Sequence, residues 1–209
     1  MTRQQFVAAL ILTGLTAILP GCGKKTTEGE HSPAQYKVRL STTRGDVLIL
    51  VHRDWAPLGA DQFYALTKAG FWDGNRFFRA LRGFVVQWGI NGDPQINKKW
   101  NEKPIDDDPP KVSNKTGTVV FATAGPHSRT TQVFINLGDN SATLDPQGFT
   151  PFGEVIQGMD NVMSFYMDYG DGPPSGSGPD QSTLASDGNS YLEQHFPKLD
   201  YIKTARLVR

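Results

Sequence analysis

Residues 76–88, Arg-Phe-Phe-Arg-Ala-Leu-Arg-Gly-Phe-Val-Val-Gln-Trp, are the stretch that decides the fold. Aromatic and β-branched residues favour strands, and Gly83 divides this run into two short ones. Arg79 lies in the first strand, between apolar neighbours. Such an arginine either extends its charged head to a wet edge or performs a chemical task. The residue alone leaves both interpretations open.

Strands predominate on both sides of this stretch. Residues 36–40 alternate apolar and polar side chains, which is typical of a half-buried strand. The composition predicts further strands at 47–52, 118–122, 132–136, 152–156 and 201–208, and helices at 57–69, 160–166 and 190–195. Residues 91–116 and 170–188 are rich in polar residues, glycine and proline, and we expect long surface loops there. The fold class is therefore mainly β with a few helices. We expect a closed antiparallel β-barrel, because closure removes exposed edges, with the last strand beside the first.

Charge and cysteine content narrow the class of protein. The chain has 21 basic and 21 acidic side chains. It lacks the basic excess that nucleic-acid binding requires, so no nucleic-acid partner is expected. A single cysteine, Cys22, excludes an internal disulfide.

The first residues predict export. Arg3 precedes an apolar run from Phe6 to Leu19, which is shorter than the roughly 20 residues of a membrane-spanning helix. The run ends in Leu-Pro-Gly-Cys, residues 19–22, which resembles the lipobox of bacterial lipoproteins. We expect a signal peptide at 1–21, lipidation of Cys22, a flexible polar tether at 22–35 and one domain at 36–209. A plain secretory signal with an incidental Cys22 is the alternative.

Common catalytic patterns are absent from the sequence. It has no Gly-x-Ser-x-Gly nucleophile elbow, no phosphate-binding loop and no dinucleotide fingerprint. Its four histidines lack the spacing of metal ligands, so neither a metal nor a cofactor is expected. The acidic triplet 106–108 lacks the spaced ligands and the turn glycine of a calcium loop. It is interpreted as part of a solvated loop.

Five ordered blocks resemble the cyclophilins, a family of peptidyl-prolyl cis/trans isomerases. They are Phe-Phe-Arg at 77–79, Gly-Phe-Val-Val-Gln at 83–87, Phe-Ala-Thr-Ala-Gly at 121–125, Thr-Gln-Val-Phe-Ile at 131–135 and Phe-Gly-Glu-Val-Ile-Gln-Gly-Met at 152–159. The resemblance extends over residues 36–160. The segment after residue 170 is similar to extensions of some bacterial members.

The resemblance implies a cyclophilin-like barrel and assigns site residues one by one. Arg79 corresponds to the catalytic arginine. Substrate-binding positions correspond to Phe84, Val85, Gln87, Ala122, Thr123, Gln132, Phe134, Leu144 and Phe149. Taken singly, the apolar members of this set could be plain core, and the two glutamines could be structural amides.

The chain departs from the family pattern at several positions. The histidine before the family arginine is Phe78 here, and the pocket methionine is Val85. Phe149 stands in place of a pocket histidine, and Thr143 in place of a tryptophan at the rim of the pocket. Arg79, Gln87 and Phe134 are kept, so we still expect activity.

The expected function is isomerisation of X–Pro bonds in exported proteins, in the cell envelope, by a lipid-anchored monomer that faces the periplasm or the cell exterior. Its partners would be proline-containing polypeptides and, through Cys22, the membrane. One alternative is a chaperone or scaffold that binds proline peptides with little turnover. Another is a structural envelope lipoprotein.

Overall fold

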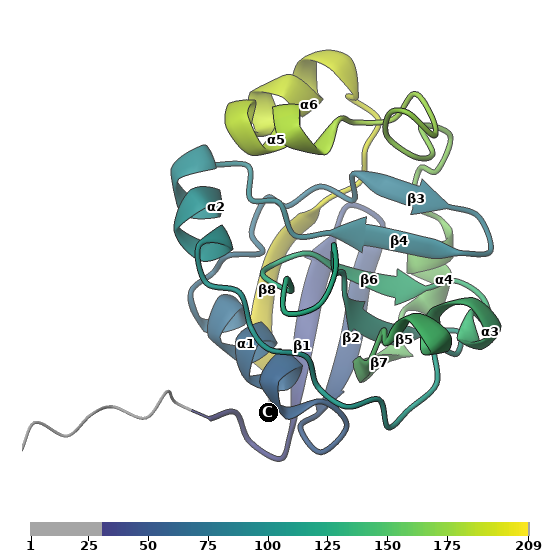
Figure 1. Ribbon diagram of the computed structural model, residues 1–209. Helices are drawn as coiled ribbons and strands as arrows, with labels where there is room; N and C mark the ends of the chain where they lie inside the picture. Colours follow the sequence, from purple (N-terminus) through teal and green to yellow (C-terminus); the bar gives the residue numbers. More distant parts are fainter. Residues whose placement is uncertain (1–30, 209) are drawn as a thin grey trace, which may run out of the picture.

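Eight strands form one curled antiparallel sheet in residues 31–208, the part of the chain that the computed structural model describes (Figure 1). The strand order is β3-β4-β6-β5-β7-β2-β1-β8. The predicted signal peptide and Cys22 lie outside the described residues. The strands are β1 (Gln35–Thr42), β2 (Gly45–His52), β3 (Arg79–Leu81), β4 (Val85–Trp88), β5 (Thr118–Phe121), β6 (Val133–Asn136), β7 (Pro151–Gln157) and β8 (Ile202–Val208).

The sheet does not close into a barrel. β8 pairs with β1, as expected. However, β3 and β8 stand at opposite ends of the strand order, and the prediction of a closed barrel is wrong. Just before these strands, one isolated bridge joins Arg76 to Tyr201, and the Phe77 amide donates to the Asp200 carbonyl at 3.0 Å. This contact lies before both strands, and β3 and β8 themselves are not paired.

The helices follow the predictions in part. α1 (Pro57–Lys68), α4 (Met159–Met163) and α6 (Asn189–His195) correspond to predicted helices. α2 (Pro94–Asn101) and α5 (Gln181–Asp187) lie where loops were predicted. Each of these two begins after an aspartate whose side chain accepts a hydrogen bond from the first turn, which is a strong helix start. Two short elements, α3 (Ser141–Leu144) and the 3-10 helix η1 (Asp145–Gln147), were not predicted.

The main core lies on one face of the curled sheet. Along β4, Val86 and Trp88 are fully buried in this core, whereas Val85 belongs to a smaller cluster. Successive side chains of a strand point to opposite faces, so Val85 and Gln87 lie together on the other side. No described helix is long and apolar enough to cross a membrane.

A second hydrophobic cluster holds the C-terminal segment, residues 164–201, against the sheet. α5 and α6 lie together beyond the β3 edge (Figure 1). Phe78, which is 1% exposed, packs there rather than in the main core. The buried members of this cluster are Phe78, Ile90, Leu184, Leu192 and Leu199.

The acidic triplet has a structural role that the sequence did not predict. Asp108 is buried and accepts from the amides of Leu58 and Gly59, in the first turn of α1, at 2.9 and 2.8 Å. It also pairs with the buried guanidinium of Arg129 at 3.1 Å. The interpretation as a solvated loop is therefore wrong for Asp108. This contact fixes the chain around Arg129, whose neighbours reach the site described below.

We predict that Phe78→Ala lowers the free energy of unfolding by about 3–5 kcal/mol, because it opens a cavity in the second cluster. Denaturant unfolding followed by circular dichroism would measure this loss. Leu58→Ala is the control, since Leu58 is 41% exposed and should change stability by less than about 0.5 kcal/mol. Equal effects of the two substitutions would contradict the prediction.

Asp108→Ala should destabilise the protein by about 3 kcal/mol, because it leaves two helix amides without their acceptor and removes the buried one of the two carboxylates that pair with Arg129. Asp106→Ala is the matched control from the same triplet, since the Asp106 side chain is 81% exposed. Thermal melting of both variants would check the difference. If Asp108→Ala melted like the wild type, the buried pair would not hold this region.

Candidate active site

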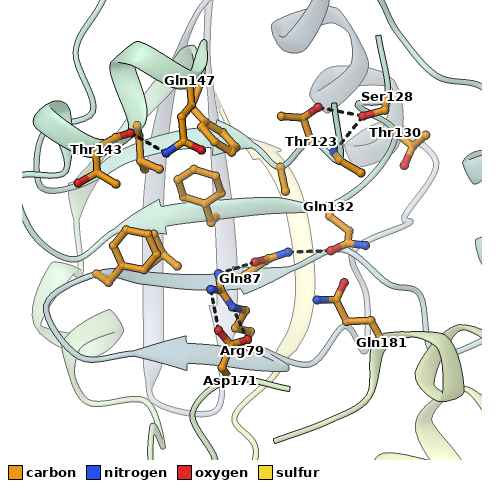
Figure 2. Close-up of a pocket in the computed structure, with 17 residues that line it drawn as sticks. Arg79, Gln87, Thr123, Ser128, Thr130, Gln132, Thr143, Gln147, Asp171 and Gln181 are labelled. Atoms are coloured by element: carbon orange, nitrogen blue, oxygen red, sulfur yellow. Dashed lines mark hydrogen bonds and ion pairs between the residues drawn. The ribbon is translucent and has the colours of Figure 1, made fainter. Parts of the chain in front are cut away.

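A pocket of about 480 Å³ lies on the sheet face opposite the main core (Figure 2). Strands β3, β4 and β6 form its base, and the segments after β5, after α3 and after α4 form its walls. The residues that line it are Arg79, Phe84, Val85, Gln87, Ala122, Thr123, Ala124, Ser128, Thr130, Gln132, Phe134, Thr143, Leu144, Gln147, Phe149, Asp171 and Gln181.

Strand register assembles the base of the pocket. Arg79 of β3 lies opposite Gln87 of β4, and Gln87 lies opposite Phe134 of β6. Residues that face one another across antiparallel strands point to the same side, so these three side chains form a row. Val85, two residues before Gln87, joins them on this face.

The floor of the pocket is apolar. Val85, Phe134 and Leu144 are 2%, 4% and 5% exposed and form a cluster separate from the main core. Phe149 meets Phe134 edge to face, with ring centroids 5.7 Å apart. The turn at Gly148, whose φ is 79°, brings Phe149 to this position. The floor therefore offers an aromatic and aliphatic surface that can hold a small ring.

Arg79 supplies a positive charge at the edge of this floor. Its Nη1 donates to Gln87 Oε1 at 3.2 Å, and its guanidinium lies 5.9 Å from the Phe84 ring centroid. Its Nε and Nη2 donate to the two carboxylate oxygens of Asp171 at 2.8 and 2.9 Å. These bonds hold the pKa of Asp171 below its ordinary value, so its carboxylate is charged at neutral pH.

Polar groups line the other side of the pocket. Gln87 Nε2 donates to Gln132 Oε1 at 2.7 Å, which continues the chain of bonds from Arg79 across the pocket (Figure 2). Further along, the Ala124 amide donates to Ser128 Oγ at 2.9 Å. A peptide laid over the floor would thus meet amide and hydroxyl groups on one side and a guanidinium on the other.

All ten residues predicted to bind substrate or catalyse line this one pocket, although their individual roles remain predictions. The prediction missed six lining residues: Asp171 and Gln181 from the C-terminal segment, and Ala124, Ser128, Thr130 and Gln147 from the walls. An arginine in an apolar strand does imply a partner, but nothing in the sequence indicates a carboxylate 92 residues away. Within residues 31–208, no group of three or more histidine, cysteine, aspartate or glutamate side chains is placed to hold a metal ion.

Comparisons with known proteins agree with this geometry. Residues 37–175 match the family described as "Cyclophilin type peptidyl-prolyl cis-trans isomerase/CLD". The chain is 31% identical over 173 residues to peptidyl-prolyl cis-trans isomerase B of Escherichia coli, and the aligned stretch covers 79% of this chain and 94% of that protein. It is 33% identical over 137 residues to a peptidyl-prolyl cis-trans isomerase of Acinetobacter baylyi, which covers 63% of this chain and 72% of that protein.

Solved structures share the fold. A cyclophilin type isomerase of Cryptosporidium parvum superposes with a TM-score of 0.60 at 21% identity, over 84% of this chain and 98% of that one. A second structure of that isomerase, solved in the presence of the dipeptide Ala-Pro, gives 0.59 at 20% identity, over 83% and 99%. The family match covers well over half of the chain, and it agrees with the pocket in which Arg79 flanks an apolar floor. The chain belongs to the cyclophilin-type peptidyl-prolyl cis/trans isomerases.

Proposed function

We propose that this isomerase acts on X–Pro bonds of exported polypeptides, with Arg79 as its catalytic residue, from a lipid anchor at Cys22. The observation that carries the catalytic part is the position of the Arg79 guanidinium, at the edge of a floor built by Phe134, Leu144 and Phe149.

The reaction requires the loss of amide conjugation. Resonance opposes rotation about the peptide bond with a barrier of about 18–20 kcal/mol. As the bond twists, the prolyl nitrogen regains its lone pair and becomes a hydrogen-bond acceptor. A donor aimed at this nitrogen stabilises the twisted state and not the planar one, which is the condition for catalysis. The guanidinium of Arg79 is always charged and meets this requirement.

The apolar floor would grip the proline ring while the flanking peptide rotates. Phe134 and Phe149 offer ring faces and edges, and Val85 leaves more room than a methionine would. The Cryptosporidium parvum structure solved in the presence of Ala-Pro supports a proline-sized ligand for this fold. Burial of the ring would hold one side of the bond fixed, so that the residue before proline turns.

Polar groups beside the floor would bind the substrate backbone. Gln132 uses its Oε1 to accept from Gln87, and we propose that its Nε2 and the chain at Ala122 and Thr123 face the peptide. Gln87 already bonds Arg79 and Gln132, so its larger contribution would be to hold both in place.

Arg79→Ala should reduce kcat/KM for a short Ala-Pro peptide by about a hundredfold, because the donor to the prolyl nitrogen is lost. Arg79→Lys should retain part of the activity, since it keeps the charge but not the planar fork. A coupled assay of cis-to-trans conversion, together with peptide binding measured by calorimetry, would check both variants. If the wild type binds the peptide but does not accelerate conversion, the alternative of a proline-peptide-binding chaperone or scaffold replaces catalysis.

The envelope location rests on the first residues of the sequence. Leu-Pro-Gly-Cys at 19–22 follows an apolar run, and Cys22 is the single cysteine of the chain. Lipidation there would place the isomerase on the outer side of the cytoplasmic membrane or on an outer membrane. It would then meet polypeptides as they emerge unfolded, when slow proline isomerisation limits folding.

Cys22→Ser should move the protein from the membrane fraction to the soluble fraction and abolish incorporation of labelled fatty acid, because it removes the thiol that would carry the lipid. Thr26→Ala, in the predicted tether, is the control and should stay with the membrane. Cell fractionation with immunoblotting measures both. Membrane retention of the unlabelled Cys22→Ser protein would contradict the lipid anchor.

A further inference from the structure

We infer that Asp171 is a positioning residue for Arg79, supplied to the active site by the C-terminal segment of the chain. The inference rests on the proposed catalytic role of Arg79. Asp171 lies in the loop between α4 and α5, outside the five family-like blocks, and its carboxylate lines the pocket from the β3 side (Figure 2).

The contact fixes the plane of the guanidinium. Asp171 accepts from Nε and Nη2 of Arg79 in a two-point contact, and Gln87 accepts from Nη1. A single bond from Gln87, at 3.2 Å, would fix one nitrogen and leave the plane free to turn. The two parallel bonds from a carboxylate define the plane as well as the position.

Donors remain for the substrate. A guanidinium has five N–H groups, and the bonds to Asp171 and Gln87 use three of them. The other two, one on Nη1 and one on Nη2, have no hydrogen-bond acceptor within the described chain. Asp171 thus occupies the edge formed by Nε and Nη2, and one N–H on each terminal nitrogen remains for the twisting amide.

Asp171 is itself held in place. Its Oδ1 accepts from the Gly172 amide at 2.9 Å, and its carbonyl accepts from the Gly178 amide at 2.8 Å. A side chain at Gly176 would bring a Cβ within 2.3 Å of that same carbonyl, so the loop closes tightly around Asp171. The carboxylate is therefore presented from a closed loop and not from a freely moving one.

The Asp171 carboxylate also has an effect that opposes catalysis. A negative charge beside Arg79 reduces the positive potential that the substrate feels. The Arg79 and Asp171 side chains are 22% and 26% exposed, so solvent offsets only part of this loss. The pair also removes the rotamer freedom of Arg79 before the substrate arrives, so this entropy is not lost during the reaction. We expect this pre-organisation to outweigh the reduced potential, so removal of the carboxylate should slow the reaction.

A neighbouring ion pair provides a matched control. Arg82 and Asp168 join the same two segments, each three residues from its counterpart in the active-site pair. Their side chains are 71% and 63% exposed, they meet at 2.7 Å, and neither lines the pocket. Asp168→Ala removes a carboxylate from the same segment without touching Arg79.

The experiment measures kcat and KM of the purified full-length protein for an Ala-Pro peptide. Asp171→Ala should lower kcat about tenfold with little change in KM, and Asp171→Asn, which keeps one acceptor, should lie between it and the wild type. Asp168→Ala should change kcat by less than about twofold. In an Arg79→Lys background, Asp171→Ala should also change kcat by less than about twofold, because lysine has no planar fork to orient.

Four results would overturn the inference. If the Asp171→Ala variant were as fast as the wild type, the carboxylate would contribute nothing to the rate. If it were faster, the carboxylate would hinder Arg79. If Asp168→Ala lowered kcat as much as Asp171→Ala does, the effect would come from attachment of the C-terminal segment and not from orientation of Arg79. If Asp171→Ala lowered kcat equally in the Arg79→Lys background, its role would be purely structural. Full activity of Arg79→Ala is a different failure, because it would remove the proposed role of Arg79 itself.

Discussion

The active site depends on how one partly buried positive charge is compensated. Arg79 lies beside an apolar floor, where an unpaired guanidinium would carry a desolvation cost of several kcal/mol. The register of β3 and β4 places Gln87 opposite it, and the loop before α5 supplies Asp171. The charge is thereby kept in an apolar setting, where it interacts more strongly with a developing lone pair than it would in open water.

The sheet serves two purposes because its strands have two faces. In β4, Val86 and Trp88 fill the core while Val85 and Gln87 build the pocket; in β6, Phe134 faces the pocket between two core residues. A slip of one residue would exchange the two sets and place the Gln87 amide in the apolar core. The same hydrophobic burial that stabilises the fold therefore also decides which side chains of β4 and β6 face the pocket.

Local patterns predicted most of this arrangement. Alternation predicted the first strand and composition the others, and the resemblance to the cyclophilins assigned ten residues that line one pocket. The predictions that failed either concerned contacts between residues far apart in the sequence or overlooked a local signal. Barrel closure depends on pairing between segments more than 120 residues apart, which the structure limits to one bridge between Arg76 and Tyr201, and the partner of Arg79 comes from a loop 92 residues away. By contrast, the starts of α2 and α5 were visible in the aspartates that cap them, but the surrounding glycine and proline favoured a loop.

The packing around Phe78 gives a physical reason for its departure from the family pattern, which has a histidine at this position. These adjacent residues contact the C-terminal segment differently: Phe78 packs under α5 and α6, and Arg79 receives Asp171. A histidine at position 78, as in the family pattern, would place two ring nitrogens among leucines and an isoleucine without acceptors or donors, which is costly. The phenylalanine thus suits the apolar side of the C-terminal segment, and the segment that packs on Phe78 is the one that brings Asp171 to Arg79.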